Sequence, residues 1–411
     1  MNVQETTARS RNREQQILDV ASRHLNTMGV SVEWFGEIAA ELGLTRPAIY
    51  KYFTDREDLQ FRCYADACDA LGARLDAATA ASSDIVEVLS AFLTKADAAP
   101  EPAVLSEMMA LPTEQRDLIW SRQRAIIDRL AALIQAGIDA KQLRPMDPVV
   151  VSHAILGMAN WTPIYARWAP TDADLDLVAV GAREILFQGL VADRSAPSAR
   201  LAPLTSLAPP QADIFNRHAV DAAKREGILI AASFLFNRRG IGATRMEDVG
   251  AALGLSKRAI YHHIGQKQDL IDACVERAYA HFLEVMRAAE NASAPRPDVI
   301  HAAVRDIIWS ASEPGVCIMA PYVGFGLLSV GERQAAADHA GQLAAGYHRV
   351  LRQGVAEGSL RPVPVDAVVA ALPGVFSWAA NGPEQSAEAR AHIADELATL
   401  ATHGVCLEPP R

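Results

Sequence analysis

Apolar residues near the start of the chain follow the period of an amphipathic helix. Ile17, Leu18, Ala21 and Leu25 are separated by steps of one, three and four residues, so they fall on one face of a helix. Gly29 comes next, and glycine is typical of a helix C-terminus because it adopts a left-handed conformation without strain. The pattern predicts a helix that packs by one face and ends at this glycine.

Two shorter helices are expected directly after it. Phe35 opens a second helical pattern, which Gly43 ends. Thr45 is a suitable N-cap for a third helix over about residues 46–53, and Pro47 would stand in its first turn, where the missing N–H costs nothing. Two short helices joined by a tight turn at glycine form the helix-turn-helix arrangement.

The third helix is expected to have an apolar and a polar side. Ala48, Ile49 and Phe53 would pack against the preceding helices. The opposite side carries hydroxyl, basic and aromatic groups that reach phosphates or base edges in DNA-binding proteins. These residues are Thr45, Arg46, Tyr50, Lys51 and Tyr52. On this segment alone, these residues could equally form an ordinary solvent-exposed helix face that does not contact DNA.

The same segment occurs twice in the chain. Ile17 matches Ile228 (228 − 17 = 211), and the register holds without a gap to Asp58 and Asp269 (269 − 58 = 211). The later matched pairs, at an offset of 217, are Leu143 with Leu360 and Trp161 with Trp378. The second copy should therefore contain six extra residues (217 − 211 = 6), which we expect between residues 333 and 354. A period of this length indicates a duplicated whole protein and not a solenoid.

Both copies of the segment resemble the DNA-binding domain of the TetR family of transcription regulators. The first reads Leu44-Thr45-Arg46-Pro47-Ala48-Ile49-Tyr50-Lys51-Tyr52-Phe53, followed by Arg56 and Leu59. The second reads Leu255-Ser256-Lys257-Arg258-Ala259-Ile260-Tyr261-His262-His263-Ile264, followed by Lys267 and Leu270. The aromatic pattern, the spacing and the capping residues carry this resemblance.

The resemblance implies that the polar side of each third helix contacts DNA. In the first copy the implied contact residues are Thr45, Arg46, Tyr50, Lys51, Tyr52 and Arg56. In the second copy they are Thr244, Ser256, Lys257, Arg258, Tyr261, His262, His263 and Lys267. The basic residue after each recognition helix, Arg56 or Lys267, is expected to bind a phosphate at the N-terminus of the next helix.

The two copies depart from the family's pattern in different ways. Glu33 stands where the family usually has Thr at the start of the second helix, whereas Thr244 fits, and Ile264 replaces the customary Phe. Since the two recognition helices differ at nearly every exposed position, we expect them to read different half-sites of an asymmetric operator. The alternative is that one copy no longer recognises a specific base sequence and contacts only the DNA backbone.

Beyond these segments each copy reads as all-helical, because alternating strand patterns between turn signals are missing. The expected fold is all-α, with two copies of a helix-turn-helix domain followed by a helical ligand-binding and dimerisation domain. By resemblance, the stretches 148–168 and 174–192 would form a four-helix bundle with 365–380 and 385–404, giving an intramolecular pseudo-dimer; a further homodimer is left open. The expected divisions are 10–60, 61–193, a linker rich in Pro, Ala and Ser at 194–213, 214–271 and 272–408.

The family's second domain holds a small-molecule pocket, so its apolar and aromatic positions are candidates to line one. In the first copy they are Met108, Met109, Trp120, His153, Trp161 and Tyr165. In the second copy they are Trp309, Met319, Tyr322, Phe325, Phe376 and Trp378. All of them also suit an ordinary core, which is the competing interpretation. Their character favours a hydrophobic effector over a charged one.

Composition and charge exclude several classes of protein. The formal net charge is −10, which argues against nucleic acid bound over the whole surface but leaves room for a small basic footprint. No apolar run reaches bilayer length, and the five cysteines show neither CxxC pairing nor zinc-site spacing, so we expect a cytoplasmic protein without a metal. Motifs for nucleotide binding or hydrolysis are missing as well, so we expect no catalytic residues, no cofactor and no enzyme.

The sequence therefore predicts a DNA-binding transcription regulator. The favoured form is a repressor that a small, apolar effector of unknown identity releases from double-stranded operator DNA. The alternative is a DNA-bound architectural or protein-interaction factor that shares the recognition helices but has no effector.

Overall fold

The computed structural model describes residues 3–29, 34–94, 101–105, 108–169, 173–206, 215–320, 323, 328–381 and 386–408. Its regular elements there are all helices, and extended pairing is limited to two isolated bridges. The all-α prediction is therefore confirmed. Within the described part of the chain, no helix is both long and apolar enough to cross a membrane.

The first copy comprises α1 to α9. Its elements are α1 (Val3–Met28), α2 (Trp34–Glu41), α3 (Arg46–Ile49), α4 (Arg56–Ala81), α5 (Ile85–Leu93), the 3-10 turn η1 (Met108–Ala110), α6 (Thr113–Asp139), α7 (Pro148–Ala159), α8 (Trp161–Tyr165) and α9 (Asp176–Gln188). We call α1–α3 the first unit. The recognition helix is shorter than expected, because regular helix ends at Ile49 and the chain continues in turns to Tyr52.

The second copy comprises α10 to α17. Its elements are α10 (Arg217–Ala243), α11 (Met246–Leu253), α12 (Lys257–Ile264), α13 (Lys267–Asn291), α14 (Arg296–Ser312), α15 (Val330–Ala356), α16 (Val365–Phe376), the 3-10 turn η3 (Ala379–Asn381) and α17 (Ala387–His403). We call α10–α12 the second unit.

The extra residues of the second copy do not lie where the sequence pattern placed them. Helices α6 and α15 each have 27 residues, and their starts differ by 217 (330 − 113 = 217). The offset has therefore already changed before α15 begins. The predicted insertion between residues 333 and 354 is wrong, because that stretch is uninterrupted helix.

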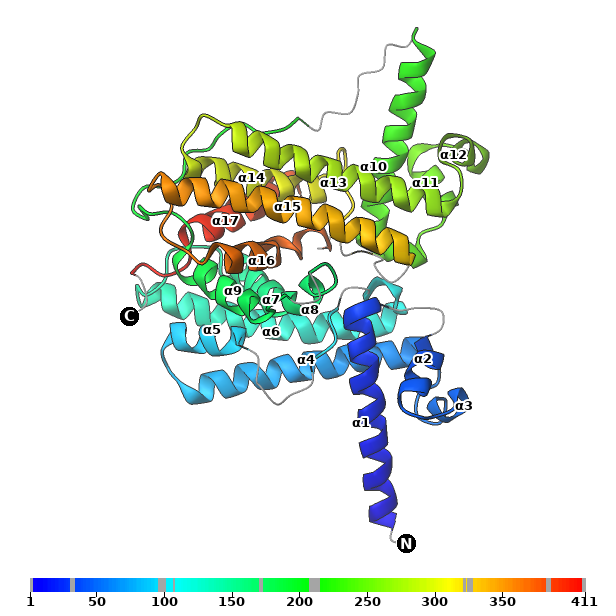
Figure 1. Ribbon diagram of the computed structural model, residues 1–411. Helices are drawn as coiled ribbons and strands as arrows, with labels where there is room; N and C mark the ends of the chain where they lie inside the picture. The colour runs from blue at the N-terminus through cyan, green and yellow to red at the C-terminus, as the bar shows by residue number, and fades with distance from the viewer. Residues whose placement is uncertain are drawn as a thin grey trace.

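The two copies pack against each other through their last helices. Helices α7 and α9 of the first copy contact α16 and α17 of the second, while α4 and α6 flank this layer on one side and α13 and α15 on the other. Figure 1 shows the layers one above the other, with the recognition helices α3 and α12 at the same end of the molecule. The pseudo-two-fold arrangement is thus formed within one chain.

Reciprocal backbone hydrogen bonds show the two-fold relation most directly. The N–H of Arg144 donates to the carbonyl of Val405 at 2.7 Å, and the matched N–H of Arg361 donates to the carbonyl of Leu190 at 3.0 Å. The isolated bridges repeat this exchange, since Leu143 pairs with Cys406 and Val191 pairs with Leu360. Each copy thus forms the same backbone hydrogen bond with the C-terminal end of the other copy.

Glycines allow the central helices to approach closely. A Cβ atom at Gly181 of α9 would collide with the carbonyl oxygen of Ala367 on α16. At the centre of the interface, a Cβ atom at Gly157 would lie 2.5 Å from the carbonyl oxygen of Gly374, its own matched residue. The indole N–H of Trp161 crosses the interface and donates to the carbonyl of Ala370 at 2.9 Å. Backbone contact of this kind fixes one relative position of the copies.

The apolar cores of the two copies are not equivalent. The core of the first unit, which includes Ile17, Trp34, Ile49 and Phe53, continues into α4 and α6 through residues such as Tyr64 and Ile119. The second unit shares one continuous core with the body of both copies. The first unit therefore shares its core with the start of α4 and α6, but not with the cluster that joins the two copies.

The described part of the linker is bound to the body. The backbone N–H of Ala199 donates to Asp298 at 2.6 Å, and that of Leu204 donates to Asp306 at 2.6 Å, both on α14. Arg194 donates to the carbonyl of His403 at 3.0 Å. The chain between the copies thus follows the surface of the second copy.

We expect the close approach at Gly181 to tolerate no side chain. Gly181→Ala should reduce the free energy of unfolding by about 1–3 kcal/mol, because the added methyl overpacks a backbone contact. Gly72→Ala is the matched control: Gly72 lies inside α4 with open space around it, so the same change should stabilise by roughly 0.5–1 kcal/mol. Urea unfolding followed by circular dichroism measures both, and equal effects would contradict the account.

His153 should make the interface between the copies sensitive to acid. Its ring stacks on Trp378 with centroids 4.5 Å apart, and burial, with a smaller effect of Arg124, lowers the pKa of His153 to about 4, against an opposing effect of Asp147. The folded state thus favours the neutral ring, so stability should fall as the pH drops from about 6.5 towards 4. His153→Phe keeps an aromatic ring and should lose less stability over that range in unfolding titrations; parallel losses would show that His153 contributes nothing.

Candidate nucleic-acid interface

The first unit is a helix-turn-helix whose core orders its exposed face. Gly43 has a φ of 62° in the turn between α2 and α3, a conformation that favours glycine. Ile49 and Phe53 are fully buried, as predicted, whereas Ala48 is only half-buried. Trp34 is also fully buried and belongs to this core, so this tryptophan has a packing role.

The predicted contact residues of the first unit lie on its outer side to different extents. Thr45, Arg46, Tyr50 and Lys51 are exposed, whereas Tyr52 and Arg56 are half-buried. The ring of Tyr50 packs edge-on against Phe35, with centroids 5.0 Å apart, while 47% of the residue stays exposed. Thr45 has the extended backbone of an N-cap, but its side chain makes no capping hydrogen bond.

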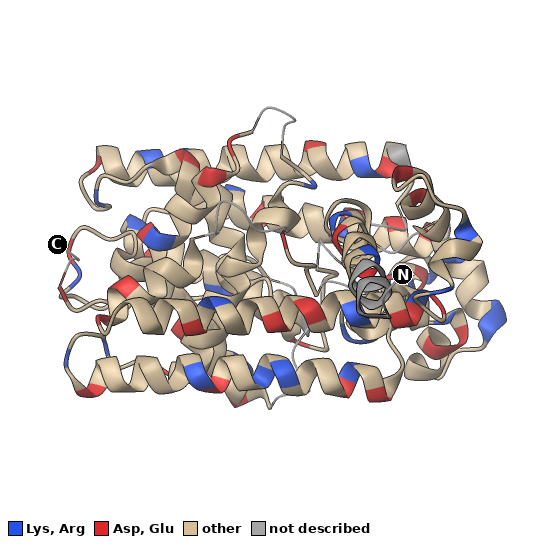
Figure 2. Ribbon diagram, turned by 90° about the horizontal axis from the view of Figure 1, so that it is seen from below, with Lys and Arg blue, Asp and Glu red and all other residues tan. Residues whose placement is uncertain are grey.

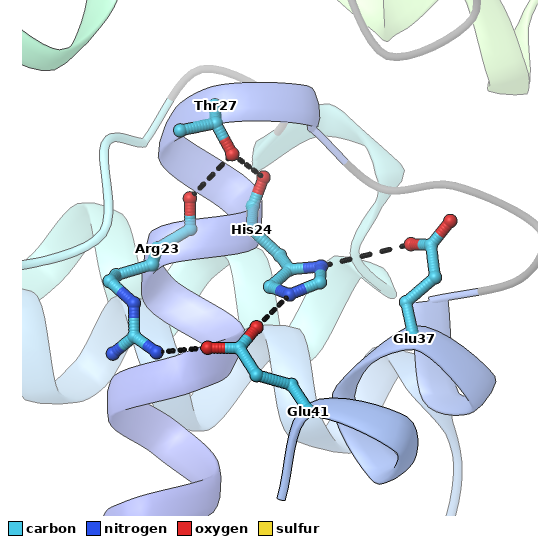
Figure 3. A network of polar contacts seen from close by, with 5 residues as sticks. All are labelled: Arg23, His24, Thr27, Glu37 and Glu41. Carbon is cyan, nitrogen blue, oxygen red and sulfur yellow. Dashed lines mark hydrogen bonds and ion pairs between the residues drawn. The ribbon is translucent and has the colours of Figure 1, made fainter.

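A polar network joins α1 to α2 in the first unit. Figure 3 shows Glu41 between Arg23 and His24; His24 Nε2 lies 2.8 Å from Glu41, and its Nδ1 lies 3.7 Å from Glu37. The hydrogen bonds from His24 and then Arg23 hold the pKa of Glu41 below its ordinary value. The second unit has Leu235 and Ala252 at the positions of His24 and Glu41 (235 − 24 = 211; 252 − 41 = 211), so this polar connection is particular to the first unit.

The second unit presents a different surface. Ser256, Lys257, Arg258 and His262 are exposed, and Tyr261, His263 and Lys267 are half-buried. The hydroxyl of Ser256 accepts a hydrogen bond from the N–H of Ala259 at 3.3 Å and so caps α12. His262 and His263 also border an open, polar hollow of about 440 Å³ beside the first part of α10.

Two basic residues of the second copy that are predicted to contact DNA already have partners within the protein. Lys257 lies 2.5 Å from Glu247 and 5.7 Å from the centre of the Tyr261 ring, and the bond to Glu247 raises the pKa of Lys257. Lys267 donates to the carbonyl of Ile241 at 2.6 Å, and burial lowers its pKa. Contact with a phosphate would require Lys267 to exchange this partner.

Thr244 does not lie where the sequence placed it. The residue is 1% exposed, and its hydroxyl donates to the carbonyl of Gly240 at 2.8 Å. It closes α10, which runs on to Ala243 past Gly240 with its φ of 76°. The prediction that Thr244 contacts DNA is therefore wrong for this conformation. Glu33, which occupies the matched position, lies outside the described residues.

The surface carries both charge signs throughout. Figure 2 shows basic and acidic positions interspersed along the long helices, and the end that carries the recognition helices has both kinds. This pattern agrees with the net charge of −10.

A buried asparagine attaches each unit to its own body. Asn26 donates to the carbonyl of Pro102 at 2.9 Å and accepts from the N–H of Val104 at 2.8 Å. The matched Asn237 (237 − 26 = 211) donates to the carbonyl of Ile318 at 2.9 Å and accepts from the N–H of Ala320 at 2.8 Å. Both asparagines thus bind the segment that follows the fifth helix of their copy.

An apolar cavity of about 320 Å³ lies between the two copies. Helices α13 to α16 of the second copy form most of it, and the segment after α7 of the first copy closes it. A volume of this size is within the range of small-molecule sites. Of the pocket residues expected from sequence, Trp161, Tyr165 and Phe376 line this cavity.

The other pocket candidates lie elsewhere. His153 and Trp378 stack on each other at the interface, Trp120 is 39% exposed, and Met319 is buried in the core. Trp309 packs against Arg390. Met108 and Met109 belong to η1, which packs on α10 of the other copy. Tyr322 and Phe325 lie outside the described residues.

Several lining residues were missed by the sequence reasoning. Tyr279 and Phe282 are one turn apart on α13, and Tyr347 faces them from α15. Their spacing of three residues was a detectable helical signal. The pairing of these helices with α8 of the other copy could not be seen from spacing alone.

Comparisons with known proteins agree with the duplicated pattern. The family model described as bacterial regulatory proteins of the tetR family matches residues 17–63 and again residues 228–274. A second model, a tetracyclin repressor-like C-terminal domain, matches residues 85–168. The first model thus matches the same segment of both copies.

Similar proteins are transcription regulators. The chain is 31% identical over 83 residues to the transcriptional repressor BepR of Brucella suis, covering 20% of this chain and 40% of BepR. It is 53% identical over 45 residues to the transcriptional regulator AcrR of Shigella flexneri, covering 11% of this chain and 21% of AcrR. The chain thus spans less than half the length of either relative. The crystal structure of the regulator PfmR from Thermus thermophilus shows 24% identity, 44% coverage of this chain and 98% of that one, with a TM-score of 0.36.

The two N-caps should differ in strength. Ser256→Ala removes a capping hydrogen bond and should cost about 1 kcal/mol of unfolding free energy. Thr45→Ala removes no such bond and should cost clearly less. Thermal unfolding of both variants measures the difference. A larger loss for the Thr45 variant would contradict the capping geometry.

Proposed function

We infer that the protein is a transcription regulator in which one polypeptide spans two half-sites of an operator. The chain belongs to the tetR family of bacterial regulatory proteins, and the DNA-binding domain is present twice. The observation that carries this proposal is the placement of α3 and α12 at the same end of one body (Figure 1). Helix-turn-helix dimers use two recognition helices in this way, on half-sites roughly 34–36 Å apart. Here both helices come from a single chain.

The two recognition surfaces are proposed to read different sequences. The first unit offers Arg46, Tyr50 and Lys51, whereas the second offers Arg258 and His262. Arginine and lysine are suited to guanine, while tyrosine and histidine make more varied contacts. The operator should therefore be asymmetric, and Thr45, Tyr52, Arg56, Ser256, Lys257, Tyr261, His263 and Lys267 are proposed to complete the contacts.

We further propose that a small apolar effector releases the protein from DNA. The support is the cavity between the copies, which is mainly apolar and has the volume of a ligand site. An effector that binds one conformation more tightly shifts the population towards it. An architectural factor without an effector would not need this cavity, so the cavity favours the regulator over that alternative. Operator affinity that no cavity ligand changes would refute release.

Alanine substitution of the recognition helices tests DNA binding. Tyr50→Ala with Lys51→Ala, and separately Tyr261→Ala with His262→Ala, should each weaken operator binding by roughly ten- to hundredfold, because each removes base or phosphate contacts. The operator can be selected from a random library by the wild-type chain, and gel-shift titration then measures the affinities.

A remote arginine serves as the control for these variants. Arg287 is exposed near the C-terminal end of α13, away from both recognition helices, so Arg287→Ala should leave the affinity unchanged. Full affinity in both double variants would refute the assigned contacts. Full affinity in one alone would identify a unit that does not read DNA.

A further inference from the structure

Both copies build the cavity, but they contribute unequally. Helices α13 to α16 of the second copy form most of its wall. The first copy closes it with Trp161, Tyr165 and Trp168, from α8 and the turn that follows. A molecule in this cavity would therefore touch the two copies at once.

The lining selects against a negative charge. Aromatic rings of the second copy, including Tyr279, Phe282 and Phe376, share the cavity with those of the first. Among the described lining residues there is no lysine or arginine. The one carboxylate, Asp366, is 69% exposed and lies 3.4 Å from His348 Nδ1. An anion placed there would lose part of its hydration, and burial lowers the pKa of His348, the basic side chain among the described lining residues, so that this ring is a poor cationic partner.

The segment that closes the cavity also holds the first unit. Arg167, between Tyr165 and Trp168, donates through Nε to the carbonyl of Asn26 at 2.8 Å and through Nη2 to that of Leu25 at 2.9 Å. These carbonyls belong to the last turn of α1, where a cation is favoured by the helix dipole. The position of the cavity wall is thus linked directly to the end of α1.

The second unit is also attached to the cavity wall. It is bound through Asn237 to Ala320, a residue of the cavity wall, as the first unit is bound through Asn26 to Val104, and it shares the continuous core of the body. The core of the first unit is separate from that cluster but extends into α4 and α6, so a shift of this unit also repacks the start of those helices.

We propose that the cavity is a composite effector site for one flat aromatic molecule without a negative charge, and that its occupancy acts on the first unit through Arg167. The regulatory part rests on the proposed function. Aromatic stacking and apolar burial supply the affinity. Displacement of the segment 161–168 alters the hydrogen bonds between Arg167 and the end of α1. The effector thereby acts on the recognition surface of the first unit.

A matched pair of probes tests the site. N-phenylnaphthylamine is neutral, and anilinonaphthalene sulfonate has the same skeleton with a negative charge. Fluorescence titration should show one neutral probe bound per chain and at least about tenfold weaker binding of the sulfonate. Equal affinities, or two neutral probes per chain, would overturn the assignment, and this comparison needs no variant.

Filling the cavity locates the probe. Ala344 of α15 lines the cavity, and Ala335 of the same helix is exposed. Ala344→Phe should abolish binding of the neutral probe, whereas Ala335→Phe should keep it. Retained affinity in the Ala344 variant would overturn the proposal. A circular dichroism melt verifies that both variants are folded.

Hydrogen–deuterium exchange tests the link through Arg167. In the wild type the neutral probe should change the exchange of residues 17–28, and Arg167→Ala should bind the probe equally well but lose this response. Arg287→Ala, an exposed arginine outside the cavity wall, should respond as the wild type does. An unchanged α1 in the wild type, a normal response in the Arg167 variant, or loss of its probe binding would each contradict the role.

These measurements separate the two proposals, because none of them uses DNA. Failure of the probe experiments would remove the effector site and leave operator binding untouched. Failure to bind any selected DNA would remove the proposed function and leave the composite site in place.

Discussion

The rest of the structure depends on the close backbone contact between the last helices of the two copies. Gly181 brings α9 against Ala367 of α16, and Gly157 meets its matched residue Gly374. The reciprocal bonds of Arg144 and Arg361 bind the end of each copy to the other. Because packed backbones have few alternative positions, these contacts set where both helix-turn-helix units stand.

Fusion of the copies allows them to differ. In a dimer of identical chains every substitution appears in both subunits. Here each unit can carry substitutions that the other unit does not have. The His24 and Glu41 network exists only in the first unit, and the serine cap of α12 only in the second. The same freedom extends to the body, where one copy supplies most of the cavity and the other closes it. The unequal exposed surfaces of the two units and the proposed effector site shared by the copies are both consequences of the duplication.

Much of the fold was predictable because its signals are local. Helical spacing identified α1 and α2, glycines marked their ends, and the repeat revealed the two copies. The insertion was misplaced because the alanine-rich α15 gives little register information. Thr244 was misassigned because α10 continues past Gly240 and turns the hydroxyl inward. The cavity could be foreseen only in part, since spacing along one helix does not show which helix of the other copy will face it.

One chain is proposed to place two DNA-binding units on one operator. Multi-angle light scattering of the protein with a selected operator duplex, at micromolar concentration, measures how many chains bind each duplex. We expect one chain per duplex, with a footprint over two half-sites about one helical turn apart. Two chains per duplex, each protecting a single half-site, would contradict it.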